Sequence, residues 1–409
     1  MTRARPSGPL LATLGLVALL VVGAAAAAVL VNTGSNPVAK VPRLPVSTGC
    51  ALHATTSNFA SVWSSANGQT VCLASGNYGA FSGGVKSSMT TIKPEDGATV
   101  TMALHFDPAA NITVDGIKAG IDPATGLGAY LNDSRTHDIT IRNSVFDRAQ
   151  VVMRTDSLPH NANILLDHNV HSNYVKCSNC YEGRVVIEGA TSGPDGITVQ
   201  NSEFYGGNSD GIQVGGRGDR ILNNHFHDIV QQGTAVHADS IQLVGPSNAT
   251  IRGNYFHDVS DAIMAPDGGD HETIEDNVVK DSLHVYAITL GGDNGSVIAH
   301  NTVWGSGQTC DFGECGVIIL GAKSGTPRGT VVKNNIATDI SDGGVPTQNL
   351  TEDYNLIAHG GTGAHDIRGV PTYVGGTSPG SLSGFTLASG SLGKLAADDG
   401  SDIGAAIGP

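Results

Sequence analysis

The middle of the chain repeats a short pattern, and this repeat constrains the fold more than any other feature. From about residue 111, segments such as ITIRNSVFDRA, ITVQNSEFYGG and RILNNHFHDI each place a short strand-like run before an asparagine and an apolar residue. The apolar residues follow one another at 22, 30, 23 and 24 positions, namely at Phe204, Phe226, Phe256, Val279 and Val303. A unit of this length cannot bury its apolar face alone, whereas stacked units can. The repeat therefore predicts a solenoid.

Each unit contains short strands and no helix. A second strand-like run, as in DGIQVGG, DSIQLVG and GVIILG, lies between many of the asparagines. No amphipathic helical pattern interrupts the region, which argues against a barrel with outer helices, and a propeller blade needs about 40–45 residues. Alternate valines, isoleucines and leucines point inward, and asparagines at equivalent turns can hydrogen-bond along the stack. The expected fold is an all-β parallel β-helix.

The pattern changes at both ends of the solenoid. Phe59, Val62 and Trp63 fall on one face of a short helix, which suits an N-terminal lid because an open solenoid must cover its ends. We expect the β-helix and this capping helix to span residues 50–345. The glycine-rich residues 346–409 are expected to form final irregular coils and a C-terminal tail.

The first residues are typical of an export signal. Arg3 and Arg5 precede an uncharged apolar stretch over residues 10–31, which is long enough to span a bilayer. The alanines at 24–28 offer cleavage sites, so residues 1–32 are either a cleaved signal peptide or a membrane anchor. Residues 33–49 are expected to be a flexible linker. The protein is then secreted or anchored at the outer face of the cytoplasmic membrane, and touches the membrane only through this segment.

Six cysteines fit an oxidising compartment. A redox or zinc role for CSNC is disfavoured, because no strand-to-helix context surrounds it and no second C-x-x-C follows. Two pairs are close in sequence and the remaining two cysteines form the third. Three disulfides are predicted: Cys50–Cys72, Cys177–Cys180 and Cys310–Cys315.

The chain is acidic. Its 37 acidic and 22 basic residues give a formal net charge of −15, which repels nucleic acid and anionic membrane surfaces. An acidic polysaccharide remains a possible partner if local cations or a metal ion offset the charge. We expect a monomer that acts on a polysaccharide and binds no nucleic acid.

Three aspartates occupy equivalent positions in three successive strands. Asp210, Asp239 and Asp261 each stand two residues ahead of an isoleucine. Parallel strands lie about 4.8 Å apart, so these carboxylates would form one column and would need a proton, a cation or a metal between them. Aspartate is also common at turns, where its side chain bonds to backbone amides. Because Tyr286 and Gly316 fall in the same column, the turn does not require aspartate, and we favour a site.

The whole pattern resembles a known group of proteins. The helix followed by GNYG, the N-x-F coils and the DIGA ending are similar to the right-handed, single-stranded parallel β-helices of the pectin-lyase-like superfamily, over about residues 50–405. The resemblance implies this fold. It does not imply one reaction, because the superfamily includes polysaccharide lyases, glycoside hydrolases, epimerases and non-catalytic adhesins or phage tailspikes.

A narrower resemblance covers two short patches. NSDGIQV is similar to the N-T-D-G-I-D segment of the polygalacturonase family of glycoside hydrolases, and HADSIQL falls where that family has D-D-C-I-A-I. Asp210 and Asp239 match the family's aspartates, whereas Ala238 stands in place of its general acid. No G-H-G or R-I-K motif follows. Another acid must then serve, and the candidates are His237, Asp261, Asp267 and Asp270.

Three functions remain open, in this order. Hydrolysis needs one protonated and one ionised carboxyl group, and Asp210 with Asp261, two coils apart, leaves room for the water of an inverting reaction. In a Ca²⁺-dependent lyase, Asp210, Asp239 and Asp261 would hold the metal ion while a basic residue removes a proton from a uronate. The third function is a non-catalytic carbohydrate-binding or surface protein, in which the column is turn chemistry only.

Further residues are predicted around the column. The segment APDGGDHE, residues 265–272, could overhang a groove and supply acid, base or metal-binding groups. The histidines of HFHD and YFHD have i, i+2 spacing and no third partner in the sequence, which favours a structural role over metal binding. The candidates of the segment are Asp267, Asp270 and His271, and the candidates for substrate contact are Arg217, Gln213, Gln242, Tyr286 and Lys280.

Overall fold

The computed structural model describes residues 49–408, apart from 155–156, 179, 190–194, 233–237, 283–286, 305–308, 311–312, 315, 322–324 and 342–346. These residues belong to one compact unit, 41–409. The expected signal or anchor and the linker up to residue 48 therefore lie outside the described residues. None of the helices in the described part of the chain has the length and apolar character needed to cross a membrane.

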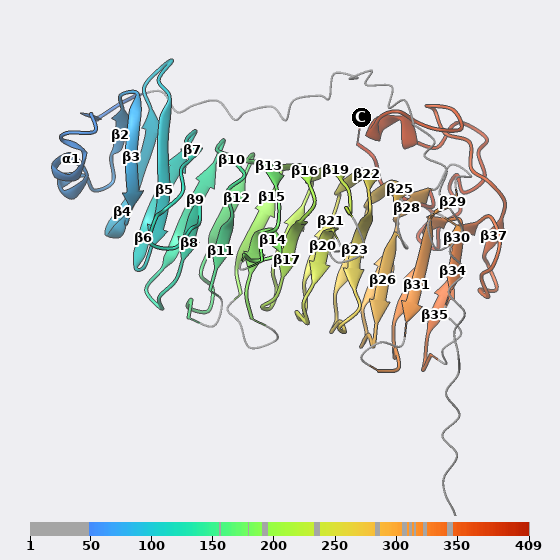
Figure 1. Cartoon of the computed structure of the whole chain (residues 1–409). Coiled ribbons are helices and arrows are strands. Elements are labelled where there is room, and N and C mark those ends of the chain that lie inside the picture. Colours follow the sequence, from blue (N-terminus) through green and yellow to red (C-terminus); the bar gives the residue numbers. More distant parts are fainter. Residues whose placement is uncertain are drawn as a thin grey trace, which may run out of the picture. The chain divides into compact units, whose positions relative to one another are not determined.

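The strands stack into three parallel ladders that run along the solenoid (Figure 1). Between residues 109 and 341 each coil contributes one short strand to each ladder in turn. Strand β5 (Val100–Phe106) pairs with strands of both the second and the third ladder. Apart from the small hairpin of β29 (Thr309–Cys310) and β30 (Gly313–Glu314), the paired strands of the described chain are parallel.

Ladder 1 starts beneath the N-terminal helix and continues to the last complete coils. Its strands are β1 (Leu52–Ala54), β2 (Thr70–Leu73), β4 (Gly84–Pro94), β6 (Ala109–Asp115), β9 (His137–Arg142), β12 (Ile164–Asp167), β15 (Ile197–Gln200), β18 (Arg220–Leu222), β21 (Thr250–Arg252), β24 (Thr273–Glu275), β27 (Val297–Ala299), β32 (Val331–Lys333) and β35 (Thr351–Asp353).

Ladder 2 follows ladder 1 across a two-residue corner. Its strands are β7 (Lys118–Ala119), β10 (Val145–Asp147), β13 (Val170–Tyr174), β16 (Glu203–Gly207), β19 (His225–Ile229), β22 (Tyr255–Val259), β25 (Val278–Ser282), β28 (Thr302–Trp304), β33 (Ile336–Ala337), β36 (Leu356–Ile357) and β37 (Ile367–Arg368).

Ladder 3 completes each coil and carries the aspartate column. Its strands are β3 (Gly76–Phe81), β5 (Val100–Phe106), β8 (Ala129–Leu131), β11 (Val151–Met153), β14 (Gly183–Ile187), β17 (Asp210–Val214), β20 (Asp239–Leu243), β23 (Asp261–Ala265), β26 (Ile288–Gly291), β31 (Val317–Gly321) and β34 (Asp339–Ser341).

The core is a column of apolar side chains inside the coils. On ladder 2 the inward rings stack at centroid distances of 4.6 to 5.0 Å, in the order Phe146, His171, Phe204, Phe226 and Phe256. Burial lowers the pKa of His171 to about 3, and the nearby Arg184 adds to this effect. His171 is therefore neutral, which allows it to take the place of a phenylalanine in the stack.

The predicted asparagine ladder is present at the corner between ladders 1 and 2. From residue 224 to residue 335, each asparagine of the ladder donates its backbone N–H and one side-chain Nδ2–H to the Oδ1 of the asparagine on the next coil. The residue just before it takes a left-handed conformation, as at Asn223 and Asp276. The ladder consists of Asn224, Asn254, Asn277, Asn301, Asn335 and Asn355.

The predicted capping helix is also present. Helix α1 (Phe59–Ser65) lies at the N-terminal end of the solenoid (Figure 1). The ring of Trp63 packs edge-on against Phe81, at a centroid distance of 5.0 Å, and its Nε1–H donates to the carbonyl of Gly83. The helix thus covers the first coil.

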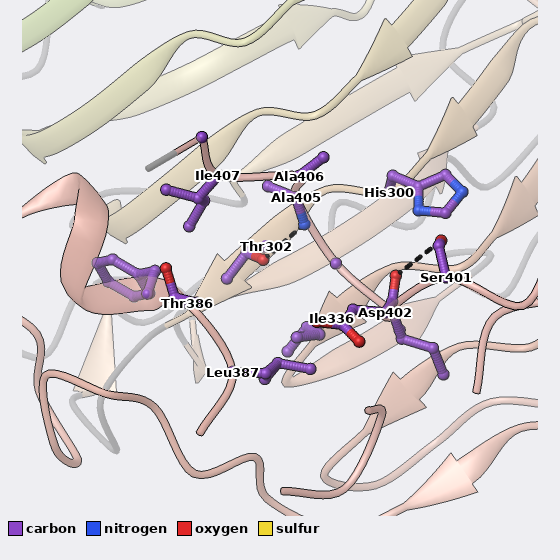
Figure 2. A pocket seen from close by; sticks show the side chains of 14 residues that line it. His300, Thr302, Ile336, Thr386, Leu387, Ser401, Asp402, Ala405, Ala406 and Ile407 are labelled. Carbon is purple, nitrogen blue, oxygen red and sulfur yellow. Dashed lines mark hydrogen bonds between the residues drawn. The ribbon is translucent and has the colours of Figure 1, made fainter. Parts of the chain in front are cut away.

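The C-terminal segment folds against ladder 2. After β37 the chain forms the 3₁₀ helix η1 (Leu382–Phe385) and irregular structure that buries Tyr373, Phe385 and Ile403 in a second apolar cluster with Val278. The backbone N–H of Ala405 donates to Thr302 Oγ1 on β28 at 3.0 Å, and a pocket of about 330 Å³ lies at this contact (Figure 2). The segment therefore covers the last coils of ladder 2.

Two of the three predicted disulfides are confirmed, Cys50–Cys72 and Cys177–Cys180. The predicted Cys310–Cys315 pair cannot be assigned, because Cys315 lies outside the described residues.

Candidate functional site

The three aspartates lie in one column, each at the start of a ladder 3 strand. Asp239 of β20 pairs directly with Asp261 of β23, and Ile241 pairs with Ile263. Ile212 of β17 pairs with Ile241, which places Asp210 next in the column. Neighbouring aspartates are thus separated by the strand spacing of about 4.8 Å. The single file predicted from the sequence is present.

The column turns outward because the alternation of side chains breaks at this corner. A Cβ atom at Gly211 would lie 2.9 Å from the inward ring of Phe226, so Gly211 faces the core together with Ile212. Asp210 instead contacts the outer face, where its Oδ2 accepts a hydrogen bond from Gln213 Nε2 at 2.9 Å. The aspartate column therefore borders the outer surface of ladder 3.

An amide pair lies beside the column. Gln213 Nε2 also donates to Gln242 Oε1 on the next coil at 2.9 Å, and Asp210 Oδ1 accepts the backbone N–H of Asp239 at 2.9 Å. Gln213 is half-buried and Gln242 is 8% exposed. Two of the predicted substrate-contact residues are thus brought next to the aspartates.

All three aspartates are nevertheless buried. Asp210 is 0%, Asp239 2% and Asp261 1% exposed. Two further predicted residues, His237 before β20 and Tyr286 before the next ladder 3 strand, β26, lie outside the described residues. A substrate must therefore gain access to carboxylates that the structure shows enclosed.

Arg184 is a charged neighbour that the sequence analysis missed. It is 0% exposed, and its Nη1 donates to the backbone carbonyls of Asp210, at 3.0 Å, and Ser209. Burial lowers the pKa of Arg184 to about 10, and the charge of Asp210 opposes this shift. An arginine in the otherwise apolar strand GRVVI was the available signal. Arg184 places a positive charge beside the first carboxylate of the column.

Other predicted residues lie at the far end of the ladder 3 strands. Asp267 is exposed and follows the end of β23, roughly 15–20 Å along the chain from Asp261. His271 Nδ1 lies 2.9 Å from Asp270 Oδ1, and Asn294 Nδ2 donates to the same oxygen. The bond from Asn294, followed by that from His271, lowers the pKa of Asp270 although burial opposes this shift. The structure does not bring these groups to the column.

Two predicted basic residues are also separate from the column. Arg217 follows β17, where it forms a bridge with Ser247 and lies 3.4 Å from His160 Nδ1 through its Nη2. Lys280 lies on β25 of ladder 2, in register with His257. Neither side chain belongs to the outer face that carries Gln213 and Gln242.

Comparison with known proteins supports the fold. Residues 183–365 match the family model described as a right-handed β-helix region. A search of curated proteins found no match.

Three solved structures are similar, each with 13% identity. They are PfbA, a surface adhesin of Streptococcus pneumoniae (TM-score 0.43, 74% of this chain and 80% of that chain), a mannuronic acid-specific polysaccharide family 6 lyase from human gut microbiota (0.42, 73% and 82%) and the pectate lyase Pel9A (0.42, 90% and 100%).

The family match and the three parallel ladders lead to the same conclusion about the fold. The chain is a right-handed parallel β-helix protein, as its resemblance to the pectin-lyase-like superfamily predicted.

Proposed function

We propose that the protein is an extracellular polysaccharide-active enzyme that cleaves glycosidic bonds by hydrolysis at the aspartate column. The observation that carries the proposal is the direct pairing of Asp239 with Asp261, next in the column to Asp210, whose carboxylate contacts the amide of Gln213. Glycoside hydrolysis requires two carboxyl groups that flank the scissile bond, and amide side chains are suited to bind sugar hydroxyls. The two disulfides support a location outside the cytoplasm.

Within the column, the reacting pair is Asp239 and Asp261. Both carboxylate oxygens of Asp210 already accept hydrogen bonds, from the Asp239 backbone and from Gln213. Asp210 is therefore a positioning residue that fixes the start of β20. Asp239 and Asp261 lie on adjacent coils, and a separation of about 5 Å between carboxyl groups is typical of retaining glycosidases. This pairing differs from the inverting pair of Asp210 and Asp261 expected from the sequence.

A Ca²⁺-dependent elimination is the second candidate. Buried carboxylates on successive coils are hard oxygen donors, and Asp239 and Asp261 together could supply up to four of the six to eight oxygens that Ca²⁺ takes. Arg184 works against this alternative, because its guanidinium group lies beside Asp210 and would repel a second cation there. We therefore place hydrolysis first.

The test combines two products with matched variants. Neutral and uronate polysaccharides are incubated with the exported chain, and reducing ends and the ultraviolet absorbance of unsaturated uronates are measured, with and without a chelator. Hydrolysis releases reducing ends without absorbance, whereas elimination gives both and requires Ca²⁺. Binding of a polysaccharide without either product would indicate a non-catalytic surface protein.

The variants decide whether the column is the site. We expect Asp239→Asn and Asp261→Asn each to lower the rate by about 100-fold or more, with thermal unfolding nearly unchanged. Asp96→Asn, at an exposed turn far from the column, is the control and should keep full activity. Full cleavage by Asp239→Asn would refute the assignment.

A further inference from the structure

The outer face of ladder 2 carries a cluster of histidines built from three successive coils. Phe204, Phe226 and Phe256 all point inward, so the residues on either side of each phenylalanine point outward. Strands β16, β19 and β22 are neighbours in this ladder (Figure 1). Their outward residues form a grid of two columns.

The histidines of HFHD and YFHD have no third metal ligand within their own segments. The neighbouring coils supply one. Glu203 of β16 is in register with His225 of β19, and His227 is in register with His257 of β22. His225 and His227 are two residues apart on one strand and therefore share its outer face. The chain thus brings one carboxylate and three imidazoles together from coils far apart in sequence.

The donor atoms are already close. Glu203 Oε1 lies 3.2 Å from His227 Nε2, and His225 Nε2 lies 2.9 Å from His257 Nε2. One ligand atom from each of Glu203, His225 and His227 lies within 4.8 Å of the others. Ligands at about 2.0–2.1 Å from a tetrahedral Zn²⁺ are about 3.3 Å apart, so small side-chain rotations suffice to enclose an ion.

Two histidines are oriented by carboxylates behind them. Nδ1 of His227 lies 2.8 Å from Asp228 Oδ2, and Nδ1 of His257 lies 2.7 Å from Asp258 Oδ2. Metal-binding histidines commonly donate their second ring N–H to such a carboxylate, which fixes the tautomer and turns Nε2 toward the ion. Here both Nε2 atoms point into the cluster.

The cluster is largely shielded from solvent. The side chains of His227, Glu203 and His257 are only 7%, 15% and 20% exposed. On the next coil, Lys280 is in register with His257, so the column of histidines ends there.

We propose that Glu203, His225 and His227 bind a divalent transition-metal ion of the Zn²⁺ type, with His257 as the fourth donor. Three nitrogens and one carboxylate oxygen are the donor set that Zn²⁺ accepts, whereas Ca²⁺ and Mg²⁺ require oxygen. Four protein ligands give a closed, structural site. The ion would link three successive coils of ladder 2, on a different face from the aspartate column.

The test is metal binding by the full exported chain after treatment with a chelator. Zn²⁺ is titrated in competition with a chromophoric indicator, and Co²⁺ is added to a second sample for its visible spectrum. We expect one tightly bound ion, a tetrahedral Co²⁺ spectrum and a higher unfolding temperature with Zn²⁺ present. A spectrum of octahedral Co²⁺, or no binding, would overturn the proposal.

Variants assign the ligands. Glu203→Gln, His225→Gln, His227→Gln and His257→Gln should each weaken Zn²⁺ binding by about tenfold or more, and Asp258→Asn should weaken it by about 10–100-fold through the orientation of His257. The control is His137→Gln, because His137 forms the same kind of pair with Asp138, at 2.7 Å, on ladder 1. A loss no greater than in the control would show that the cluster is only hydrogen-bonded. Far-ultraviolet circular dichroism without metal establishes that each variant is folded.

Discussion

Asn277 is the residue at which the asparagine ladder can be broken most cleanly. Its side chain makes four hydrogen bonds: Oδ1 accepts from the backbone N–H and the Nδ2 of Asn254, and Nδ2 donates to the Ile251 carbonyl and to Asn301 Oδ1. Asn254, Asn277 and Asn301 are all 0% exposed, which leaves no solvent to replace a lost partner. The substitution Asn277→Ala removes all four bonds and adds no bulk.

The loss in the free energy of unfolding depends on which groups keep another hydrogen-bond partner after the substitution. Asn254 Nδ2 still donates to the Ile221 carbonyl, and Asn301 Oδ1 still accepts the backbone N–H of residue 277. The backbone N–H of Asn254 loses its acceptor, which costs about 1–3 kcal/mol, and the remaining bonds contribute about 0.5–1.5 kcal/mol each. We expect a loss of roughly 2.5–7.5 kcal/mol in the free energy of unfolding.

Urea unfolding measures this loss. Circular dichroism and intrinsic fluorescence are followed together, because a solenoid can unfold in parts and the two curves must coincide for a two-state free energy. Gln348→Ala is the control, since its amide is exposed, and should change the free energy by no more than about 0.5 kcal/mol. A loss for Asn277→Ala as small as in the control would refute the view that the ladder stabilises the stack.

Two other perturbations concern charge and cross-linking. Burial, reinforced by Asp195, raises the pKa of Asp219 to about 8 although the Ile197 N–H bond opposes the shift, so the folded chain holds a proton that the unfolded chain loses above about pH 4. The free energy of unfolding should therefore fall between about pH 4 and 8. In urea unfolding, Asp219→Asn should show a smaller fall and should be more stable than the wild type near pH 8. An unchanged dependence of the free energy on pH would contradict the assignment. Replacing Cys50 and Cys72 by serine opens a loop of sequence separation 22 and should cost about 3 kcal/mol, and an unchanged unfolding temperature would count against this value.

Most of the fold could be predicted from the sequence because one corner recurs from coil to coil. The asparagine before each apolar residue marks the end of a ladder 1 strand, and aligning the coils on it gives the register of ladder 2. The same alignment places Glu203 above His225 and Tyr205 above His227, as the structure does. The metal-ligand cluster could therefore have been found by comparing neighbouring coils rather than residues within one segment.

The surroundings of the aspartate column could not be derived in the same way. Strict alternation would send Asp210 to the same side as Ile212, but Gly211 also faces the core and the corner rotates the aspartate outward. The burial of a side chain depends on such local rotations and on the residues that pack over it. Neither repeats from coil to coil. Arg184 was missed for the same reason, because the carbonyls that it binds, at Gly206, Ser209 and Asp210, belong to the next coil.

The bonds between the asparagines also have a direction. Each asparagine donates its backbone N–H and one Nδ2–H to the coil that follows, while its other Nδ2–H goes to a carbonyl of the preceding coil, as at Asn277. The last member, Asn355, donates its backbone N–H to Asp366 Oδ1 at 2.9 Å and its Nδ2 to the same atom at 3.3 Å. A carboxylate accepts without having to donate in turn, so it can terminate such a chain. The protein can thus be lengthened or shortened only in whole turns that carry a side-chain acceptor at this corner, an asparagine or, as at Ser202, a serine, and only if an acceptor remains at the terminus.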